Sequence, residues 1–337
     1  MTDKYDQAAE DAMKQDAVDK AAVRLEELER ALLDSEQLAN IPPPEPLIDG
    51  YLFRDSLAWI GGKPGHCKSF AAAEMACRIA TGTPWYGHAT KQAKVLYLIA
   101  EGVPGFGQRI ATWEAYNGLS TKGWATFLPV PVQFLKDVDV LALAMLLDKR
   151  RPDLVFFDTQ ARVTVGMKEN DSTDMGIFVD KLSELRRMYG ACLLLVHHEP
   201  RNSENLRGSI AMEGAADSVF RTFKEGNQVS FETTKQKDIE EPDPFDLQLF
   251  KTHTSAVLTL LKPGEEALTQ TEMTIIKVVQ DNPSEWVSKT ETKITCAPMP
   301  EPTFYRNING LIRKGYLDQT DGRVKMLRYV PEEERSV

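Results

Sequence analysis

The sequence predicts an α/β fold with a mainly parallel sheet, because strand and helix patterns alternate from about Leu47 to Leu261. The apolar runs VLYLIA, LVFF and CLLLV lack the alternation of a half-solvated strand, which indicates strands buried on both faces, as in a parallel sheet. A glycine-rich stretch, GGKPGHCKS, lies between an apolar run and a helical pattern, as is typical of this fold class.

The order of the elements follows from these patterns. The expected strands are Leu57–Gly61, Val95–Ala100, Leu154–Asp158, Ala191–His197 and Ser218–Phe223. The expected helices between them are Ser69–Thr81, Phe106–Tyr116, Val138–Arg150 and Thr173–Tyr189. The stretch Gln228–Leu261 alternates more clearly, so we expect antiparallel strands at one edge of the sheet.

An N-terminal helical arm precedes this core. Residues 6–38 contain no Gly or Pro, and an apolar stripe with 3-4 spacing runs through Val18, Ala21, Leu25, Leu28 and Leu32. The stripe docks either on the chain's own core or on a neighbouring subunit. The prolines of Ile41–Pro46 exclude helix and predict a linker. The expected divisions are an arm with its linker at 1–42, a core at 43–262 and a second domain at 267–337.

The C-terminal part has two helical patterns, Leu268–Gln280 and Pro302–Lys314, with room for a short helix near Thr290–Cys296. Two strands around an Asp-Gly turn follow, and this order resembles a winged helix-turn-helix. The second helix would place Arg306, Arg313 and Lys314 in a DNA major groove, while Arg323, Lys325 and Arg328 contact phosphates. The alternative is that this domain binds a partner protein or its own ring.

Composition limits the classes of function. The net charge of the 337 residues is −10, with 11 acidic against 5 basic residues in the first 40, which argues against a surface that binds nucleic acid throughout. Residues 283–330 hold 8 basic and 5 acidic residues, so the charge does not exclude a local surface that binds nucleic acid in this segment. Without a signal peptide or an apolar run of membrane-spanning length, we expect a cytoplasmic protein with no membrane partner. The four widely spaced cysteines predict free thiols.

Gly62–Ser69 matches the phosphate-loop pattern G-x-x-x-x-G-K-[ST] except at Cys67, where glycine is usual. A surface turn is the alternative, but the preceding strand and following helix favour a nucleotide site. The nucleotide-binding candidates are Gly61, Gly62, Lys63, Pro64, Gly65, His66, Cys67, Lys68, Ser69 and Phe70. Lys68 would reach the β- and γ-phosphates and Ser69 would hold Mg²⁺. Cysteine can be accepted if its φ stays negative and its Cβ points away, which leaves a thiol close to the phosphates. Whether oxidation of this thiol blocks ATP binding is then an open question.

Two carboxylates follow strands. Asp158 ends the apolar strand pattern LVFFD. We expect it to be the second residue of the metal site, where its carboxylate orients a water on magnesium. Glu101 follows VLYLIA, at the tip of what we expect to be the strand next to the phosphate-loop strand, placed to polarise the attacking water. The alternative for Glu101 is an ordinary solvent-facing side chain.

His197 and His198 follow the CLLLV strand. Adjacent strand residues point to opposite faces, which argues against one shared metal ion and favours His198 as a sensor of the γ-phosphate. Four basic residues come later: Arg207, Arg221, Lys235 and Lys237. They are either solvated charges or, in a ring, candidates for a cation that reaches a neighbour's γ-phosphate.

These motifs, in this order and spacing, resemble RecA-like ATPases of the RepA type, the hexameric replicative helicases of plasmids and phages. The resemblance covers about Pro43 to Leu261 and implies a RecA-like P-loop NTPase core that binds Mg-ATP through Lys68, Ser69 and Asp158. It implies Glu101 as catalytic base and His198 as sensor. In proteins of the wider group, the corresponding interface motif commonly ends in arginine, whereas this chain has Lys237. The resemblance therefore does not decide which of the four basic residues is the trans-acting cation.

The resemblance also implies partners: a homo-oligomer, expected to be a hexamer, and single-stranded DNA held by the loops Arg162–Asp174 and Arg201–Arg207. The first loop mixes Arg162 and Lys168 with Glu169, Asp171 and Asp174, which is a poor cationic track. Primase or a single-strand-binding protein is a further possible partner. A DNA-binding initiator or loader switched by ATP, and a regulatory nucleotide-binding protein without DNA, are the alternative functions.

Overall fold

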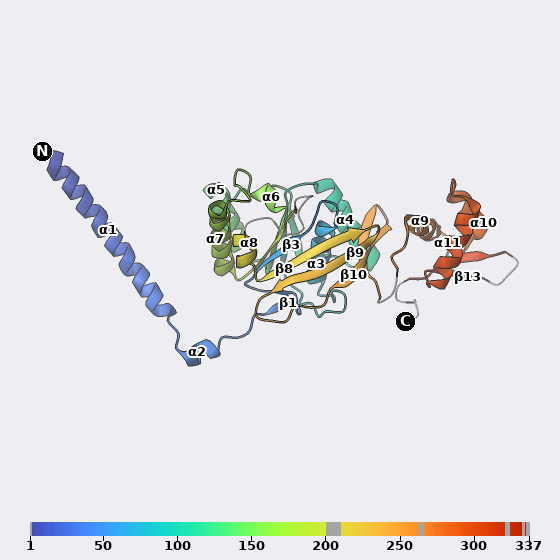
Figure 1. Cartoon of the computed structure of the whole chain (residues 1–337), viewed down its shortest axis with the longest axis horizontal. Helices are drawn as coiled ribbons and strands as arrows, with labels where there is room; N and C mark the ends of the chain where they lie inside the picture. Colours follow the sequence, from blue (N-terminus) through green and yellow to red (C-terminus); the bar gives the residue numbers. More distant parts are fainter. Residues whose placement is uncertain (1, 200–209, 263–265, 321–323, 332–333, 335–337) are drawn as a thin grey trace. The chain divides into compact units, whose positions relative to one another are not determined.

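The computed structural model describes residues 2–199, 210–262, 266–320, 324–331 and 334, with side chains described from residue 15 onward except those of 210 and 211. The chain divides into two compact units, residues 1–44 and residues 45–337. Figure 1 follows the chain through both units. The predicted division between 43–262 and 267–337 stays a prediction, because both segments fall inside the second unit.

The first unit is helical, but the single helix expected over 6–38 is wrong. Helix α1 spans Thr2–Ala31, and a second helix, α2, spans Ser35–Ala39. Asp34 separates them, because its side chain accepts a hydrogen bond from the Gln37 N–H at 2.8 Å and begins a new helix with a capping box. Side chains 15–44 are exposed, including the apolar stripe.

The second unit contains a nine-stranded sheet in the order β11-β10-β9-β8-β3-β7-β6-β4-β5. Its strands are β3 (Leu57–Gly61), β4 (Val95–Ile99), β5 (Ala125–Leu128), β6 (Leu154–Asp158), β7 (Cys192–Val196), β8 (Ser218–Glu225), β9 (Gln228–Gln236), β10 (Phe245–Thr252) and β11 (Ser255–Leu260). Pairing is parallel from β8 to β5 and antiparallel from β8 to β11. The predicted strands and the antiparallel edge are therefore confirmed, while β5 was not anticipated. A small hairpin of β1 (Pro46–Ile48) and β2 (Leu52–Phe53) precedes the sheet, so the predicted linker already turns into strand at Pro46.

Helices cover both faces of the parallel strands (Figure 1). They are α3 (Lys68–Thr81), α4 (Val103–Asn117), α5 (Asp137–Arg150), α6 (Gln160–Val163), α7 (Ser172–Tyr189) and α8 (Ile210–Ala215). Alternate residues of one strand enter two separate buried clusters: Phe156 packs with α3 and α4, and Phe157 packs with α5 and α7. Because both faces are covered, the central strands need the uninterrupted apolar runs seen in the sequence.

The C-terminal elements are α9 (Gln270–Gln280), β12 (Val287–Ser288), α10 (Lys289–Thr295), α11 (Glu301–Arg313), β13 (Leu317–Gln319) and β14 (Met326–Tyr329). The strands pair antiparallel in the order β12-β14-β13. Two long helices, a short helix and a terminal strand pair were expected and are present, whereas the winged-helix interpretation stays a prediction. Phe304 and Met273 belong to the same buried cluster as α3 and α4, so these elements pack continuously with the core.

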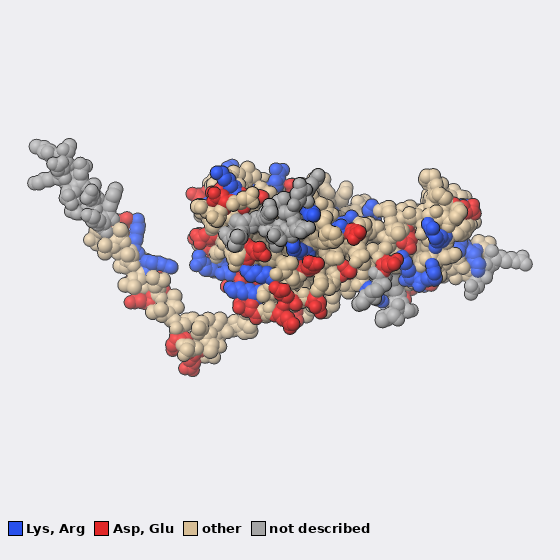
Figure 2. Space-filling view, viewed as in Figure 1, with Lys and Arg blue, Asp and Glu red and all other residues tan. Residues whose placement is uncertain are grey.

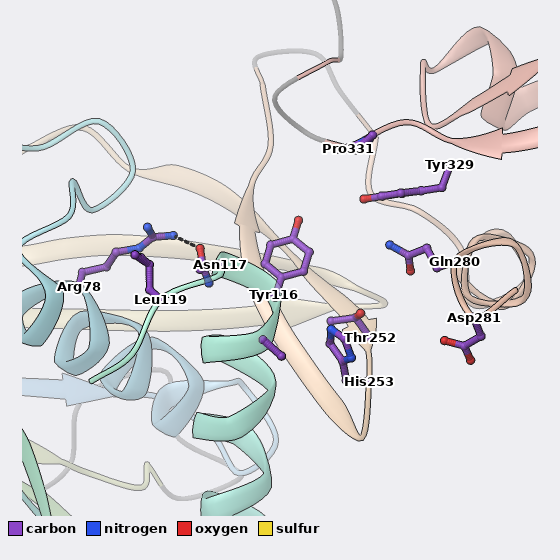
Figure 3. Close-up of a pocket in the computed structure, with 11 residues that line it drawn as sticks. Arg78, Tyr116, Asn117, Leu119, Thr252, His253, Gln280, Asp281, Tyr329 and Pro331 are labelled. Atoms are coloured by element: carbon purple, nitrogen blue, oxygen red, sulfur yellow. Dashed lines mark hydrogen bonds between the residues drawn. The ribbon is translucent and has the colours of Figure 1, made fainter. Parts of the chain in front are cut away.

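A polar cavity of about 460 Å³ lies where the C-terminal elements meet the core. Figure 3 shows Tyr116 at the end of α4 and Tyr329 of β14 projecting toward it from opposite sides, with Gln280 and Asp281 at the end of α9. The Arg78 guanidinium on its rim is held by Asn117 at 3.0 Å. None of the residues that line this cavity belongs to the phosphate loop.

Candidate nucleotide site

The phosphate loop connects β3 to α3 at the carboxyl edge of the parallel strands. Gly61 ends the strand and Lys68 begins the helix, so the amino terminus of α3 faces the loop, as an anion site requires. Gly62 has φ +150°, and a Cβ placed on it would lie 2.6 Å from the Thr222 carbonyl oxygen, so glycine is sterically required there. The close approach of β8 therefore fixes the start of the loop.

Cys67 departs from the sequence-based expectation. Its φ is +63°, in the left-handed region, whereas we expected that cysteine is accepted with a negative φ. The usual glycine reaches this conformation without cost, but a residue with a Cβ is strained there by about 1–2 kcal/mol. The loop keeps its geometry with cysteine and stores this strain.

The Cys67 thiol is also less reactive than we expected. It is 9% exposed, and its Sγ lies 4.0 Å from the Gly65 carbonyl oxygen. Burial raises the pKa of the Cys67 thiol to about 11, even though Lys224 and Arg109 favour the thiolate. Because the thiolate is the reactive form, this burial disfavours oxidation of the Cys67 thiol. All four cysteines are free, as predicted, and all are buried.

Lys68 points back into the loop that precedes it. Its Nζ donates to the carbonyl oxygens of Gly62 at 2.7 Å and Lys63 at 2.9 Å, and the residue is only 3% exposed. Burial lowers the pKa of Lys68 to about 8, with Asp158 acting in the opposite direction. The ammonium thus lies desolvated inside the loop, where the charge of a phosphate would replace the weaker carbonyl dipoles.

Asp158 joins the loop to the end of β6. Its Oδ1 accepts from Ser69 Oγ at 3.1 Å, and its Oδ2 accepts from the Tyr97 hydroxyl at 2.8 Å. Asp158 is 4% exposed, and burial raises the pKa of this carboxyl while both hydrogen bonds oppose the rise. The structure therefore brings together the two predicted metal-site residues, which lie 89 positions apart in the chain.

These two residues fit magnesium. A hydroxyl and a carboxylate supply oxygen ligands, which Mg²⁺ prefers, and Mg²⁺ usually takes its remaining ligands from phosphates and water. Among the residues that the structure describes, no group of three or more His, Cys, Asp or Glu side chains forms an all-protein metal cage. The donor set is thus suited to a metal that arrives with a nucleotide.

Glu101 lies just beyond β4, but β4 is not next to the phosphate-loop strand. Strands β7 and β6 separate it from β3, because the order along the chain does not determine the order in a crossover sheet. Glu101 still faces the site edge: its Oε1 is 3.5 Å from His198 Nε2 and its Oε2 is 3.5 Å from Arg162 Nε. The expected adjacency of Glu101's strand to the phosphate-loop strand is therefore wrong, and the structure places Glu101 beside His198.

The two histidines differ in environment. His198 is 36% exposed and faces Glu101, whereas His197 is 4% exposed and both of its ring nitrogens lack a partner among the described residues. Burial lowers the pKa of His197 to about 4, and the nearby His198 and Lys68 add to the effect. His197 is therefore a neutral, desolvated imidazole at neutral pH.

Three residues of this edge were missed from the sequence. Tyr97 binds Asp158, Glu199 donates its backbone N–H to the Gly62 carbonyl at 3.1 Å, and the Arg109 guanidinium stacks on Phe70 at 3.9 Å. A hydroxyl inside the apolar run VLYLIA was a usable signal for Tyr97. Nothing in the local pattern distinguishes Arg109 or Glu199 from ordinary surface charges.

Among the described candidates for a trans-acting cation, Arg221 alone is seen to line a cavity with residues of this chain's own phosphate loop. Arg221 pairs beside Gly61 in the sheet, but its Nε and a terminal nitrogen both bind Oε1 of the buried Glu199 at 3.0 Å. Lys235 donates to the Glu213 and Gly214 carbonyls at the end of α8. Lys237 lies 3.5 Å from Asp217, beyond the amino end of β8, and its side chain is 60% exposed. Arg207 and the loop Arg201–Arg207 lie outside the described residues.

Other candidate residues of the loop lie between β3 and α3. Lys63 and His66 line a small cavity of about 240 Å³ together with Arg221 and Phe223, and the His66 ring contacts Phe223 edge-on at 5.2 Å. Burial lowers the pKa of His66. Pro64 and Gly65 form the exposed tip of the loop. This edge thus gathers the amino terminus of α3, the Ser69–Asp158 pair and the Glu101 carboxylate, which are the groups expected of a site for a nucleotide and its metal.

Comparison with known proteins identifies a family for this chain. A family model described as an AAA domain matches residues 22–204, more than half of the chain. The chain therefore belongs to this AAA domain family, which supports a P-loop ATPase. Among solved structures it is similar to a KaiC-like protein from the hyperthermophilic archaeon Pyrococcus horikoshii OT3, at 15% identity and a TM-score of 0.44, covering 63% of this chain and 93% of that chain. No curated protein matched in sequence. No helix among the described residues is long and apolar enough to span a membrane.

Proposed function

We propose that this AAA-domain protein is a Mg-dependent ATPase that works as a ring-forming RecA-like motor on single-stranded DNA, of the plasmid or phage replicative helicase type. One observation carries the ATPase part: Ser69 Oγ lies 3.1 Å from Asp158 beside the buried Lys68. Such a constellation binds a nucleotide phosphate and its metal together.

Each residue of the nucleotide site has a separate role in the proposed hydrolysis. Lys68 exchanges the Gly62 and Lys63 carbonyls for the β- and γ-phosphates, and the α3 amino terminus adds its dipole. Ser69 and Asp158 would hold Mg²⁺, which would neutralise charge on the phosphates when bound. Glu101 takes the proton of the attacking water, and His198 reports the γ-phosphate through its contact with Glu101.

The ATPase part is tested by phosphate release with the full-length protein. Lys68→Ala should abolish activity, and chelation of Mg²⁺ should do the same. Lys122→Ala is the matched control, since it removes an exposed lysine between α4 and β5 that takes no part in the contacts of the loop. Equal activity of Lys68→Ala and the unmodified protein would refute the assignment.

The catalytic base is tested separately. Glu101→Gln keeps the size of the side chain and removes its basicity, so we expect ATP binding to persist while hydrolysis falls by about 10²–10⁴-fold. If Glu101→Gln hydrolyses ATP at the normal rate, the base is another residue and only the nucleotide site stands.

A second candidate, an ATP-switched initiator or loader without unwinding activity, is favoured by one observation. In the loop Arg162–Asp174, Arg162 contacts Glu101, and Asp171 and Asp174 accept backbone hydrogen bonds within the loop. Only Lys168 is left as a basic side chain without a described partner, so the loop offers little positive charge to a DNA strand.

Strand displacement on a forked substrate separates the two. Unwinding that requires ATP and is lost in Lys68→Ala supports the motor. DNA-stimulated hydrolysis without unwinding supports the loader, and hydrolysis that ignores DNA supports a regulatory nucleotide-binding protein. Light scattering with and without ATP and single-stranded DNA tests the ring: a monomer under all conditions removes the basis for any trans-acting cation. Primase or a single-strand-binding protein as partner stays a proposal.

A further inference from the structure

The outward face of α5 is apolar and exposed. Val138, Leu141 and Met145 are 70%, 63% and 66% exposed, and Leu135, just before the helix, is 58% exposed. The three helical residues share one side of α5, because they follow one another at spacings of three and four. Single exposed apolar side chains are ordinary, but several large ones gathered at one helix are typical of a surface that binds a partner.

The opposite side of α5 is fixed on the core. Leu143 and Leu147 are buried in the cluster that α5 shares with α7. The Tyr189 hydroxyl of α7 donates to the Ala144 carbonyl of α5 at 2.7 Å. Turning the apolar side of α5 inward would break this packing, so what covers that side has to come from another molecule.

The face is complementary to a second copy of itself. Ala142 is exposed beside Leu141, and its small side chain lets the backbone of a second helix come close. A twofold axis midway between Val138 and Met145 places the Val138 of each helix on the Met145 of the other. The same axis brings the two Ala142 side chains together. Such a contact uses one surface on both chains, as in most symmetric dimers.

The charges at the two ends of α5 favour an antiparallel pair. The first turn carries Asp137 and Asp139, and the last turn carries Lys149 and Arg150. In an antiparallel pair, each acidic end meets the basic end of the other helix, whereas a parallel pair places like charges together. In Figure 2, the surface over α5 and α7 shows acidic as well as basic side chains. A membrane-binding helix is instead bordered mainly by basic residues.

We propose that two copies of this chain pair through α5, antiparallel about a twofold axis at Leu141 and Ala142. This pairing goes beyond the proposed function, because it needs neither ATP nor a ring. In a ring-forming chain, the same contact joins two rings, since the neighbours within a ring meet through different surfaces. One helix face is smaller than a standard protein interface, so we expect a dissociation constant of about 1–100 µM.

Cysteine cross-linking of the full-length protein tests the geometry. The four native cysteines are buried, so an introduced surface thiol is the reactive one. Under mild oxidation, Ala142→Cys should form a disulfide between two chains, seen as a two-chain band on a denaturing gel without reductant. Lys122→Cys is the matched control, because it places a thiol at an exposed position between α4 and β5. Equal cross-linking of these two variants would overturn the proposal.

Two further thiols test the direction of the helices. Val138→Cys and Met145→Cys should each cross-link weakly alone and strongly when mixed, because position 138 faces position 145 only in the antiparallel pair. If Val138→Cys alone cross-links as strongly as the mixture, the antiparallel assignment is wrong. Each gel reads a covalent pair of chains, so the result does not depend on whether the protein hydrolyses ATP or forms rings.

Light scattering without ATP or DNA, at about 100 µM protein, tests the pairing in solution. Leu141→Glu should weaken the association at least about tenfold and lower the mean mass toward half. Ile294→Glu is the matched control: it makes the same kind of change at a 71% exposed position of α10, which lies at the opposite end of the second unit from α5 (Figure 1). Variants are compared only where thermal unfolding matches the unmodified protein.

The apolar stripe of the N-terminal arm offers a competing explanation for any association. The double change Leu25→Glu and Leu28→Glu removes that stripe and should leave the mean mass unchanged. If this double variant lowers the mass and Leu141→Glu does not, the arm makes the contact and the proposal for α5 is overturned. An unmodified protein that stays a single chain at about 100 µM would overturn it as well.

Discussion

The Tyr97 hydroxyl, in the middle of β4, donates a hydrogen bond of 2.8 Å to Oδ2 of Asp158 at the end of β6. Ser69 occupies the other oxygen, so each carboxylate oxygen of Asp158 has one donor. Burial raises the pKa of the Asp158 carboxyl, while hydrogen bonds to both oxygens favour the ionised form and fix its orientation. Tyr97 is therefore a positioning residue for the metal site, held on the strand next to Asp158.

Tyr97→Phe removes this donor and leaves the ring in place. We expect a loss of about 2 kcal/mol in the free energy of unfolding, because the lost bond had a charged, buried acceptor. We also expect ATP hydrolysis to need more Mg²⁺ for half-maximal rate. Urea unfolding and a Mg²⁺ titration measure both. Tyr189→Phe, which removes a hydroxyl bound to the Ala144 carbonyl at 2.7 Å, should reduce stability but leave the Mg²⁺ requirement unchanged.

Cys67→Gly should stabilise the protein. The left-handed conformation at φ +63° costs a residue with a Cβ about 1–2 kcal/mol, while glycine adds about 0.5–1 kcal/mol of unfolded-state entropy. The difference predicts a gain of about 0.5–1 kcal/mol in the free energy of unfolding, measured by urea. Cys67→Ala keeps the Cβ and should bring no gain. Because both variants lack the thiol, a Cys67→Gly protein less stable than Cys67→Ala would contradict the strain at this position. ATP affinity of the same variants tests whether the relaxed loop binds phosphate more tightly.

The sequence predicted the interior of the sheet better than its edges. Strands β3 and β6 begin and end where the apolar runs do. A strand buried on both faces is built almost entirely from apolar residues, so its ends are visible in the sequence. The edge strand β5 was missed, since Ala125–Leu128 is only half-buried and lacks that signal. The break in the N-terminal arm was missed too, because Asp34 resembles any exposed helical acid until its side chain caps α2.

In the candidate site, too, the sequence predicted the features that have a local pattern and missed those that depend on the fold. The phosphate loop and Asp158 follow from a local pattern, and the structure places them together. The position of Glu101 depended on strand order, which no local pattern contains. The φ of Cys67 is set by the strand-loop-helix geometry around it, so the sequence alone gave no means to reject a negative value.

His197 should make stability fall in mild acid. Its pKa is about 4 in the folded protein against 6.5 for an unperturbed imidazole, so between these values the unfolded chain binds the extra proton. Stability is thus unaffected above about pH 6.5 and declines as pH falls through this window. Between pH 6.5 and pH 5 the loss from this residue is about 2 kcal/mol. In His197→Leu, the free energy of unfolding should therefore fall less between pH 6.5 and pH 5, as measured by urea unfolding at both pH values. His253→Asn, which changes a histidine on an exposed turn, should leave this pH dependence unchanged. A His197→Leu protein with the same pH dependence as the unmodified protein would contradict the assignment.

Lys237 and Arg221 should behave differently when each is replaced by alanine. Arg221→Ala leaves the buried Glu199 carboxylate without its partner, so we expect the free energy of unfolding to fall by about 3–5 kcal/mol. Lys237→Ala removes a largely exposed side chain and should cost less than about 1 kcal/mol. If Lys237 acts on a neighbour's γ-phosphate, its variant should fold normally and lose ATP hydrolysis.

Mixing variants decides whether that action crosses between subunits. Lys68→Ala lacks a working phosphate loop but keeps Lys237, and Lys237→Ala has the reverse defect. Mixed rings then contain interfaces with an intact loop facing an intact Lys237, so the mixture should recover ATP hydrolysis that neither variant has alone. Lys235→Ala mixed with Lys68→Ala is the control, because the Lys235 ammonium is already held at the end of α8. Recovery only with Lys235→Ala would move the role to that lysine, and normal hydrolysis by Lys237→Ala alone would remove Lys237 from the candidates.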